Sequence, residues 1–175
     1  MSDVTQTVIT TGRAWCLGPN VDTDALAPGH AMSKGIEVIA RHCLEDVRPE
    51  FSTQVQAGDC LVAGAGFGIG SSREQAASVL VTLGVRAVIA PSFSGLYFRN
   101  AFNVGLLLVT CPRATDVADG DALTVAIDPR DGVTVASAQL GALEVSPIPD
   151  FLLRRVLLGG LLNELKELKL KEKHV

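Results

Sequence analysis

The feature that most constrains the fold is an alternation of short apolar runs with longer amphipathic segments in the middle of the chain. Three apolar runs have the length of buried strands and the two segments between them have helical spacing, which gives, in chain order, residues 60–63, 73–83, 87–90, 94–102 and 106–110. Successive strands in this order run parallel, because each helix crosses the sheet before the next strand begins. The sequence therefore predicts an α/β fold with a mainly parallel central sheet and covering helices.

Patterns on either side extend this fold. Residues 7–17 read as one or two strands, and residues 34–47 are compatible with a helix. Apolar runs at 122–127 and 133–137, separated by Asp-Pro-Arg-Asp-Gly, predict a β-hairpin. Residues 151–171 predict a final amphipathic helix, interrupted by two adjacent glycines.

Composition excludes several classes of function. With 175 residues and 47% hydrophobic content, the chain can build a sizeable core, and we expect one domain over residues 1–175. The net charge of −4 and the pI near 5.3 argue against nucleic acid as a partner, since nucleic acid requires a basic face. No apolar stretch reaches the length of a membrane span, and no basic then apolar leader begins the chain. We therefore expect a cytoplasmic protein that binds small molecules or other proteins.

The four cysteines are scattered along the chain. Cys16, Cys43, Cys60 and Cys111 lack the close paired spacing of zinc or iron–sulfur ligands. A reduced cysteine in an apolar run behaves as a small hydrophobic residue. We expect reduced structural thiols and no cofactor or metal held by this chain.

A glycine-rich loop follows the first buried strand. Residues 64–70 alternate glycine with other residues and lead into Ser71, Ser72 and Arg73. Ligands of parallel sheets gather at the carboxyl ends of strands, where this loop lies. A helix N-terminus and an arginine both favour an anion, so the loop is predicted to hold a carboxylate or a phosphate.

Spacing tests separate the possible ligands of this loop. Neither the dinucleotide fingerprint G-x-G-x-x-G nor the phosphate loop G-x-x-x-x-G-K-[ST] fits, which makes a nucleotide the weaker hypothesis. A purely structural alternative is a capping box, in which Ser72 accepts from a helix amide and Gln75 reaches back.

Three blocks of sequence carry a family resemblance. Asn-Val-Asp-Thr-Asp at 20–24, Gly-Ile-Gly-Ser-Ser-Arg-Glu at 68–74 and the segment 91–106 resemble, in order, the signatures of the swivelling domain of the aconitase superfamily. The chain is similar to the small-subunit family of isopropylmalate dehydratases, with the homoaconitase small subunits as siblings. This resemblance implies a β/β/α swivelling domain that closes over an aconitase-like large subunit carrying a 4Fe-4S cluster. The implied reaction dehydrates and rehydrates a small hydroxy acid.

The resemblance also implies residue roles. Ser71 corresponds to the catalytic base, Ser72 and Arg73 to positions that bind the substrate carboxylate, and Asp24 to an acidic active-site position. For Asp24 a simple turn or helix cap is the structural alternative. Within the family's substrate-selecting loop, here residues 28–35, Lys34 is a candidate for a distal carboxylate and Met32 for an alkyl group; plain loop surface is the alternative for both.

Some positions differ from the family pattern. Ile69 stands where cysteine is frequent, and Gln75 stands where histidine is frequent. The leading hypothesis is a hydro-lyase small subunit for 3-isopropylmalate. Alternatives are a related dehydratase acting on homoaconitate, dimethylmalate or a methylcitrate-like acid, or a non-catalytic module that binds anions. The partner-facing surface also favours self-association when the large subunit is absent.

Overall fold

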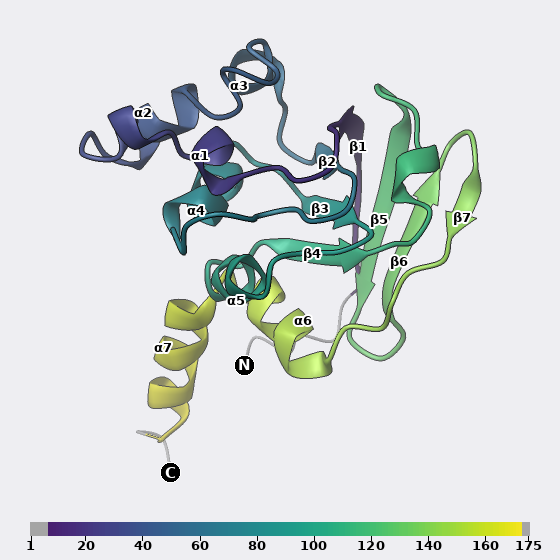
Figure 1. Cartoon of the computed structure of the whole chain (residues 1–175). Coiled ribbons are helices and arrows are strands. Elements are labelled where there is room, and N and C mark those ends of the chain that lie inside the picture. Colours follow the sequence, from purple (N-terminus) through teal and green to yellow (C-terminus); the bar gives the residue numbers. More distant parts are fainter. Residues whose placement is uncertain (1–6, 173–175) are drawn as a thin grey trace.

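A seven-stranded sheet with the strand order β4-β3-β2-β1-β5-β6-β7 organises the protein, and the computed structural model describes residues 7–172 (Figure 1). The strands are β1 Val8–Cys16, β2 Cys60–Val62, β3 Ala87–Ala90, β4 Leu107–Thr110, β5 Ala122–Asp128, β6 Gly132–Ser137 and β7 Gly141–Leu143. The helices are α1 Thr23–Leu26, α2 Ile36–Arg41, α3 Phe51–Gln54, α4 Gln75–Thr82, α5 Gly95–Asn103, α6 Asp150–Leu157 and α7 Leu161–Glu172, with the 3₁₀ turns η1 Gly29–Ala31 and η2 Ala114–Asp116.

Strand β1 joins two halves of the sheet that run in different directions (Figure 1). Its last three residues pair in parallel with β2, and its first six pair antiparallel with β5. Gly12 lies at the change of partner, where a side chain would overlap the backbone of Gly58. The parallel half, β1 to β4, carries the site described below, whereas β5, β6 and β7 form an antiparallel meander.

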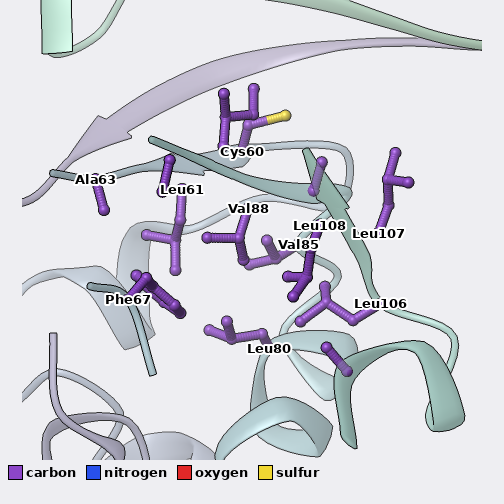
Figure 2. Close-up of a cluster of buried hydrophobic side chains, with 14 of the residues drawn as sticks. Cys60, Leu61, Ala63, Phe67, Leu80, Val85, Val88, Leu106, Leu107 and Leu108 are labelled. Carbon is purple, nitrogen blue, oxygen red and sulfur yellow. The ribbon is translucent and has the colours of Figure 1, made fainter. Parts of the chain in front are cut away.

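The core lies between the parallel strands and the helices that cover them. Leu61, Val88 and Leu108 are cross-strand neighbours on β2, β3 and β4, and each is at most 1% exposed. Leu80 of α4 closes this cluster from the helix layer (Figure 2). Each such side chain contributes about 1.5–3 kcal/mol through its burial, so this layer fixes the position of α4 and of the loop before it.

The structure confirms the predicted fold class, with the parallel strands, the two crossover helices and the hairpin of β5 and β6 in place. Gly84 and Gly105 follow α4 and α5 with φ of 81° and 83°, as expected of residues that terminate helices. The final helix is divided into α6 and α7 at Gly159 and Gly160. None of the helices within residues 7–172 is long and apolar enough to cross a membrane.

Several details differ from the sequence prediction. The helix expected over 34–47 is limited to α2, since the chain turns at His42 and Leu44 adopts a left-handed φ of 60°. The short helices α1 and α3 and the edge strand β7 were not predicted, because segments of three or four residues are too short to show a periodic pattern.

Candidate active site

The three sequence blocks meet around the glycine-rich loop. On one side the N–H of Gly68 donates to the carbonyl of Val21 at 2.8 Å, and the N–H of Thr23 donates to the carbonyl of Ile69 at 2.9 Å. On the other side Phe67 forms an isolated parallel bridge with Phe93. The loop is therefore held between the first and the third block by backbone hydrogen bonds.

The alternating glycines serve this packing. An added Cβ at Gly68 would overlap the ring of Tyr97, and one at Gly70 would lie 2.7 Å from a carboxylate oxygen of Asp22. Both glycines also have positive φ, 78° and 99°, which other residues rarely adopt. At Gly68 and Gly70 the atoms that approach the backbone closely belong to the chain itself.

The two serines lie exposed where the loop leaves this packed region. The N–H of Ser71 donates to the hydroxyl of Thr23 at 3.0 Å, and Thr23 is only 1% exposed. Neither the Ser71 nor the Ser72 hydroxyl has a hydrogen-bond partner among residues 7–172. The backbone of Ser71 is thus fixed by a buried residue, while its side chain is free to act.

The capping box predicted for Ser72 and Gln75 is not formed. Helix α4 begins at Gln75, two residues later than predicted, and its N-cap is Glu74, which makes no side-chain capping bond. Because no capping bond engages the Ser72 hydroxyl, capping does not explain this serine.

Arg73 and Asp24 are brought into direct contact across the loop. Nη1 of Arg73 donates to Oδ1 of Asp24 and, at 3.0 Å, to the carbonyl of Ala27. Asp24 is not a helix cap: that role belongs to Asp22, whose carboxylate accepts from the N–H of Asp24 at 2.7 Å. Nε and Nη2 of Arg73 have no acceptor within the described residues, so one edge of the guanidinium is open for a planar anion.

The predicted substrate loop lies beside this pair. Its residue Gly29 is so placed that an added Cβ would be 3.9 Å from Oδ1 of Asp24. Lys34 is exposed, whereas Met32 is partly buried against the hydrophobic core. No hydrogen bond or ion pair joins either side chain to Ser71 or Arg73 within the described part of the chain.

Sequence reasoning missed two supporting residues of this region. In the sequence Thr23 is only one of several polar residues of a predicted turn, yet its buried hydroxyl accepts a hydrogen bond from the Ser71 N–H. Asn20 has a φ of 58°, a conformation that asparagine tolerates better than most residues, and its N–H donates to the carbonyl of Ala65 at 2.8 Å. In the third block Phe102 is buried beside Phe98, which makes them the core face of α5, and Arg99 is exposed.

The cysteines do not form a ligand set. All four are free, and burial raises the pKa of Cys16 to about 11 and that of Cys60 to about 12. Burial raises the pKa of Cys43 and Cys111 as well. Within residues 7–172 the one group of three potential metal ligands consists of His30, His42 and Glu45, which does not match the thiolates of an iron–sulfur cluster.

Comparison with known proteins gives one consistent family. A family model described as "Aconitase C-terminal domain" matches residues 26–114, just over half of the chain. The chain is 40% identical over 159 residues to the 3-isopropylmalate dehydratase small subunit 1 of Archaeoglobus fulgidus, covering 90% of this chain and 98% of the relative. It is 39% identical over 158 residues to the corresponding subunit 1 of Thermotoga maritima, with 89% and 94% covered.

A solved structure agrees with these relatives. The crystal structure of a 3-isopropylmalate dehydratase from Methanocaldococcus jannaschii has a TM-score of 0.85 and 35% identity, and the match covers 95% of this chain and 99% of that one. The fold, with its three joined blocks, is that of a swivelling domain of the aconitase C-terminal type. Within this class, the chain belongs to the family of 3-isopropylmalate dehydratase small subunits.

Proposed function

We propose that this chain is the small subunit of a heteromeric hydro-lyase that interconverts 2-isopropylmalate and 3-isopropylmalate in leucine biosynthesis. The named relatives are 3-isopropylmalate dehydratase small subunits, and each match covers most of both chains. The observation that carries the proposal is the exposed Ser71–Ser72 pair, whose hydroxyls have no hydrogen-bond partner among the described residues, next to the Arg73–Asp24 pair.

Ser71 is the proposed base. In the reaction a proton leaves the carbon next to a carboxylate while hydroxide leaves the neighbouring carbon, and a double bond forms between them; water then adds back in the opposite sense. The Ser71 oxygen accepts that proton and returns it during rehydration. Because the Thr23 hydroxyl fixes the backbone of Ser71, the serine oxygen projects from a rigid point.

Arg73 is the proposed carboxylate clamp, with Ser72 as a second hydrogen-bond donor. The contacts of Nη1 with Asp24 and Ala27 set the plane of the guanidinium and leave Nε and Nη2 for two parallel hydrogen bonds. Asp24 thus orients Arg73. Lys34 and Met32, on the adjacent loop, are proposed to select the rest of the substrate through a second charge and an apolar contact.

The 4Fe-4S cluster is proposed to belong to an aconitase-like large subunit. The dispersed thiols of this chain, three of them buried, do not fit a cluster, whereas the exposed serine and the partly exposed arginine fit one half of a site completed from outside. When bound in the partner, the cluster would supply a Lewis acid for the departing hydroxide. Binding of the carboxylate and transfer of the carbon-bound proton fall to Arg73 and Ser71 of this chain.

Reconstitution tests the proposal. The chain is combined anaerobically with its cognate large subunit, and turnover is followed on 2- and 3-isopropylmalate and on a panel of malates substituted at C2 or C3. Turnover that prefers isopropylmalate is expected. Absence of turnover on every acid in the panel would reject the hydro-lyase assignment. A preference for homoaconitate, dimethylmalate or a methylcitrate-like acid would change the assigned substrate and keep the class of enzyme.

The loop variant Lys34→Ala sharpens the substrate assignment. Loss of activity on acids with a distal carboxylate, with activity on isopropylmalate retained, is the result expected of a charge that reads the far end of the substrate. If Lys34→Ala keeps the parent's activity on every acid, Lys34 does not take part in substrate selection.

A non-catalytic anion-binding module is the second candidate, favoured by the isoleucine at position 69 and the glutamine at position 75. Such a module keeps its affinity for carboxylates when Ser71 is replaced by alanine, whereas an enzyme loses turnover. We also propose a cytoplasmic location, in keeping with four free thiols, and self-association of the isolated chain. Sedimentation with and without the large subunit tests the latter.

A further inference from the structure

The cluster of His30, His42 and Glu45 is not used by the proposed reaction. Nε2 of His30 lies 2.5 Å from one carboxylate oxygen of Glu45, and Nδ1 of His42 lies 2.6 Å from the other. The two imidazole rings meet edge to face, with their centroids 4.9 Å apart. One carboxylate therefore bridges two imidazoles that come from separate segments, the η1 turn and the C-terminal end of α2.

We propose that these three side chains bind a divalent late transition metal, with Zn²⁺ as the best match. Two imidazoles and one carboxylate are a donor set that zinc accepts, with water in the fourth position. The three ligand atoms already lie within 4.8 Å of one another.

The side chains must adjust to accept the ion. Tetrahedral zinc with bonds of about 2.0–2.1 Å sets its ligand atoms roughly 3.3 Å apart, so the two contacts with Glu45 lengthen by about 0.8 Å, while ligand atoms that are further apart move closer together. The side chains are 55%, 35% and 32% exposed for His30, His42 and Glu45, which leaves room to adjust and access for water. Each imidazole moves its proton to the opposite ring nitrogen, which has no partner within residues 7–172.

The backbone around Leu44 holds the ligands together. Leu44 is a fully buried residue with a left-handed φ of 60°, and its N–H donates to the carbonyl of Ala25 at 2.7 Å. This conformation costs a non-glycine residue about 1–2 kcal/mol. It reverses the chain so that the N–H of Glu45 reaches the carbonyl of His42 at 3.2 Å, which returns the Glu45 side chain to the imidazoles.

A bound ion would fix the segment that leads to the proposed substrate loop. His30 lies three residues after Ala27, whose carbonyl accepts from Arg73, and two residues before Met32. The ion would tie this turn to the segment 42–45 with bonds stronger than the present hydrogen bonds. The proposal does not depend on the reaction that the chain supports.

Metal titration of the full chain tests the site. Chain freed of metal by a chelator is titrated with Co²⁺, a spectroscopic substitute for Zn²⁺, and with Zn²⁺ in a calorimeter. All variants carry His174→Ala, because His174 lies outside the described residues and offers a competing imidazole. We expect one ion per chain, visible Co²⁺ bands of a four- or five-coordinate site without a thiolate charge-transfer band, and a higher melting temperature with Zn²⁺.

Matched variants locate the ligands. His30→Ala and Glu45→Gln are each expected to weaken binding at least about tenfold and to remove the rise in melting temperature. The control Glu37→Gln removes an exposed carboxylate from α2 and leaves the affinity unchanged. The proposal is overturned by absence of stoichiometric binding in the parent chain, by a thiolate band, or by a metal affinity of His30→Ala and Glu45→Gln that equals that of the parent chain.

Discussion

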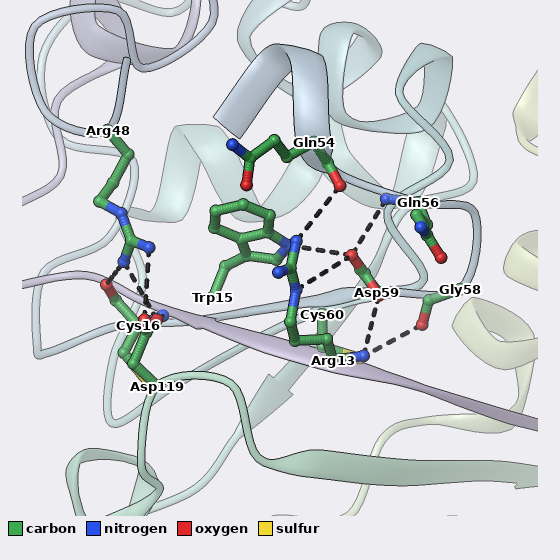
Figure 3. A network of polar contacts seen from close by, with 10 residues as sticks. All are labelled: Arg13, Trp15, Cys16, Arg48, Gln54, Gln56, Gly58, Asp59, Cys60 and Asp119. Atoms are coloured by element: carbon green, nitrogen blue, oxygen red, sulfur yellow. Dashed lines mark hydrogen bonds and ion pairs between the residues drawn. The ribbon is translucent and has the colours of Figure 1, made fainter. Parts of the chain in front are cut away.

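Two polar regions of this protein are built from similar residue types and differ in whether their bonding capacity is used. Around Asp59, one carboxylate accepts from the N–H groups of Arg13 and Gln56 and from the indole of Trp15, at 2.8, 3.0 and 2.9 Å (Figure 3). Around Arg73, the adjacent serine hydroxyls have no partner among the described residues. Polar groups that satisfy one another hold the fold, whereas exposed unsatisfied groups are available to a substrate.

The Asp59 network also shows why a cavity alone is weak support for a site. A depression of about 620 Å³ is lined by Arg13, Gln54, Gln56 and Asp59, among others. Its charged groups already bind each other, and the Arg13 guanidinium stacks 3.9 Å from the centroid of Trp15. This region is therefore assigned to stability.

Loss of the Ser71 hydroxyl is expected to give the largest effect. Ser71→Ala in the reconstituted enzyme should lower kcat by about 10²–10⁴-fold, the usual contribution of a positioned base. Stability should not change, because this side chain has no partner among the described residues. Steady-state kinetics and thermal melts measure both, with the exposed Ser146→Ala as control. A kcat within a few fold of the parent would remove Ser71 from the base role.

Gly68→Ala should destabilise the chain most among single changes in the loop. The new methyl group overlaps the Tyr97 ring at a positive φ, for an expected loss of about 3 kcal/mol in the free energy of unfolding. Gly120→Ala is the matched control, since Gly120 has a φ of 83° with nothing within 4 Å of an added Cβ, and should cost about 1 kcal/mol. Urea unfolding measures the loss in the free energy of unfolding of each variant. Equal losses would show that backbone strain alone, and not the overlap with Tyr97, destabilises Gly68→Ala.

Asp59→Asn should lower the free energy of unfolding by about 2 kcal/mol, because the side-chain amide turns a donor toward N–H groups that need acceptors. Burial works to raise the pKa of Asp59, but the bonds from Gln56, Trp15 and Arg13 outweigh it and lower the pKa below its ordinary value. The ionised Asp59 carboxylate therefore contributes its full stabilisation above the pKa of an unfolded aspartate, about 4. This contribution is lost as the pH falls through the lowered pKa of Asp59 in the folded protein. Unfolding measured from pH 6 to pH 2 should show a shallower acid dependence in the variant; parallel curves would contradict this.

Changes at the Arg73–Asp24 pair should be smallest and confined to binding. Arg73→Lys keeps the charge but loses the two-pronged contact, so KM should rise about tenfold with a smaller change in kcat. Asp24→Asn should raise KM only about threefold, since it loosens the arginine at an exposed position. An unchanged KM for Arg73→Lys would show that the open edge of the guanidinium binds no carboxylate.

Much of the fold follows from local pattern. The runs that form β2, β3 and β4 are apolar except for Thr110 because both faces of a parallel strand are buried, and glycines end α4 and α5 as expected. Helix α2 is shorter than predicted because tertiary burial of Leu44 imposes a left-handed turn that local propensity opposes.

The sequence by itself predicted the parallel strands with their crossover helices, the β-hairpin and the family, because these depend on periodicity and on short ordered blocks. Only the tertiary structure decided that Asp22 caps α1 while Asp24 meets Arg73, and that Thr23 holds the amide of Ser71. It also showed that Gly68 and Gly70 leave room for Tyr97 and Asp22. Apart from the local bond between Asp22 and Asp24, these contacts join residues more than twenty positions apart, and such pairs are set by packing between elements, which no local pattern records.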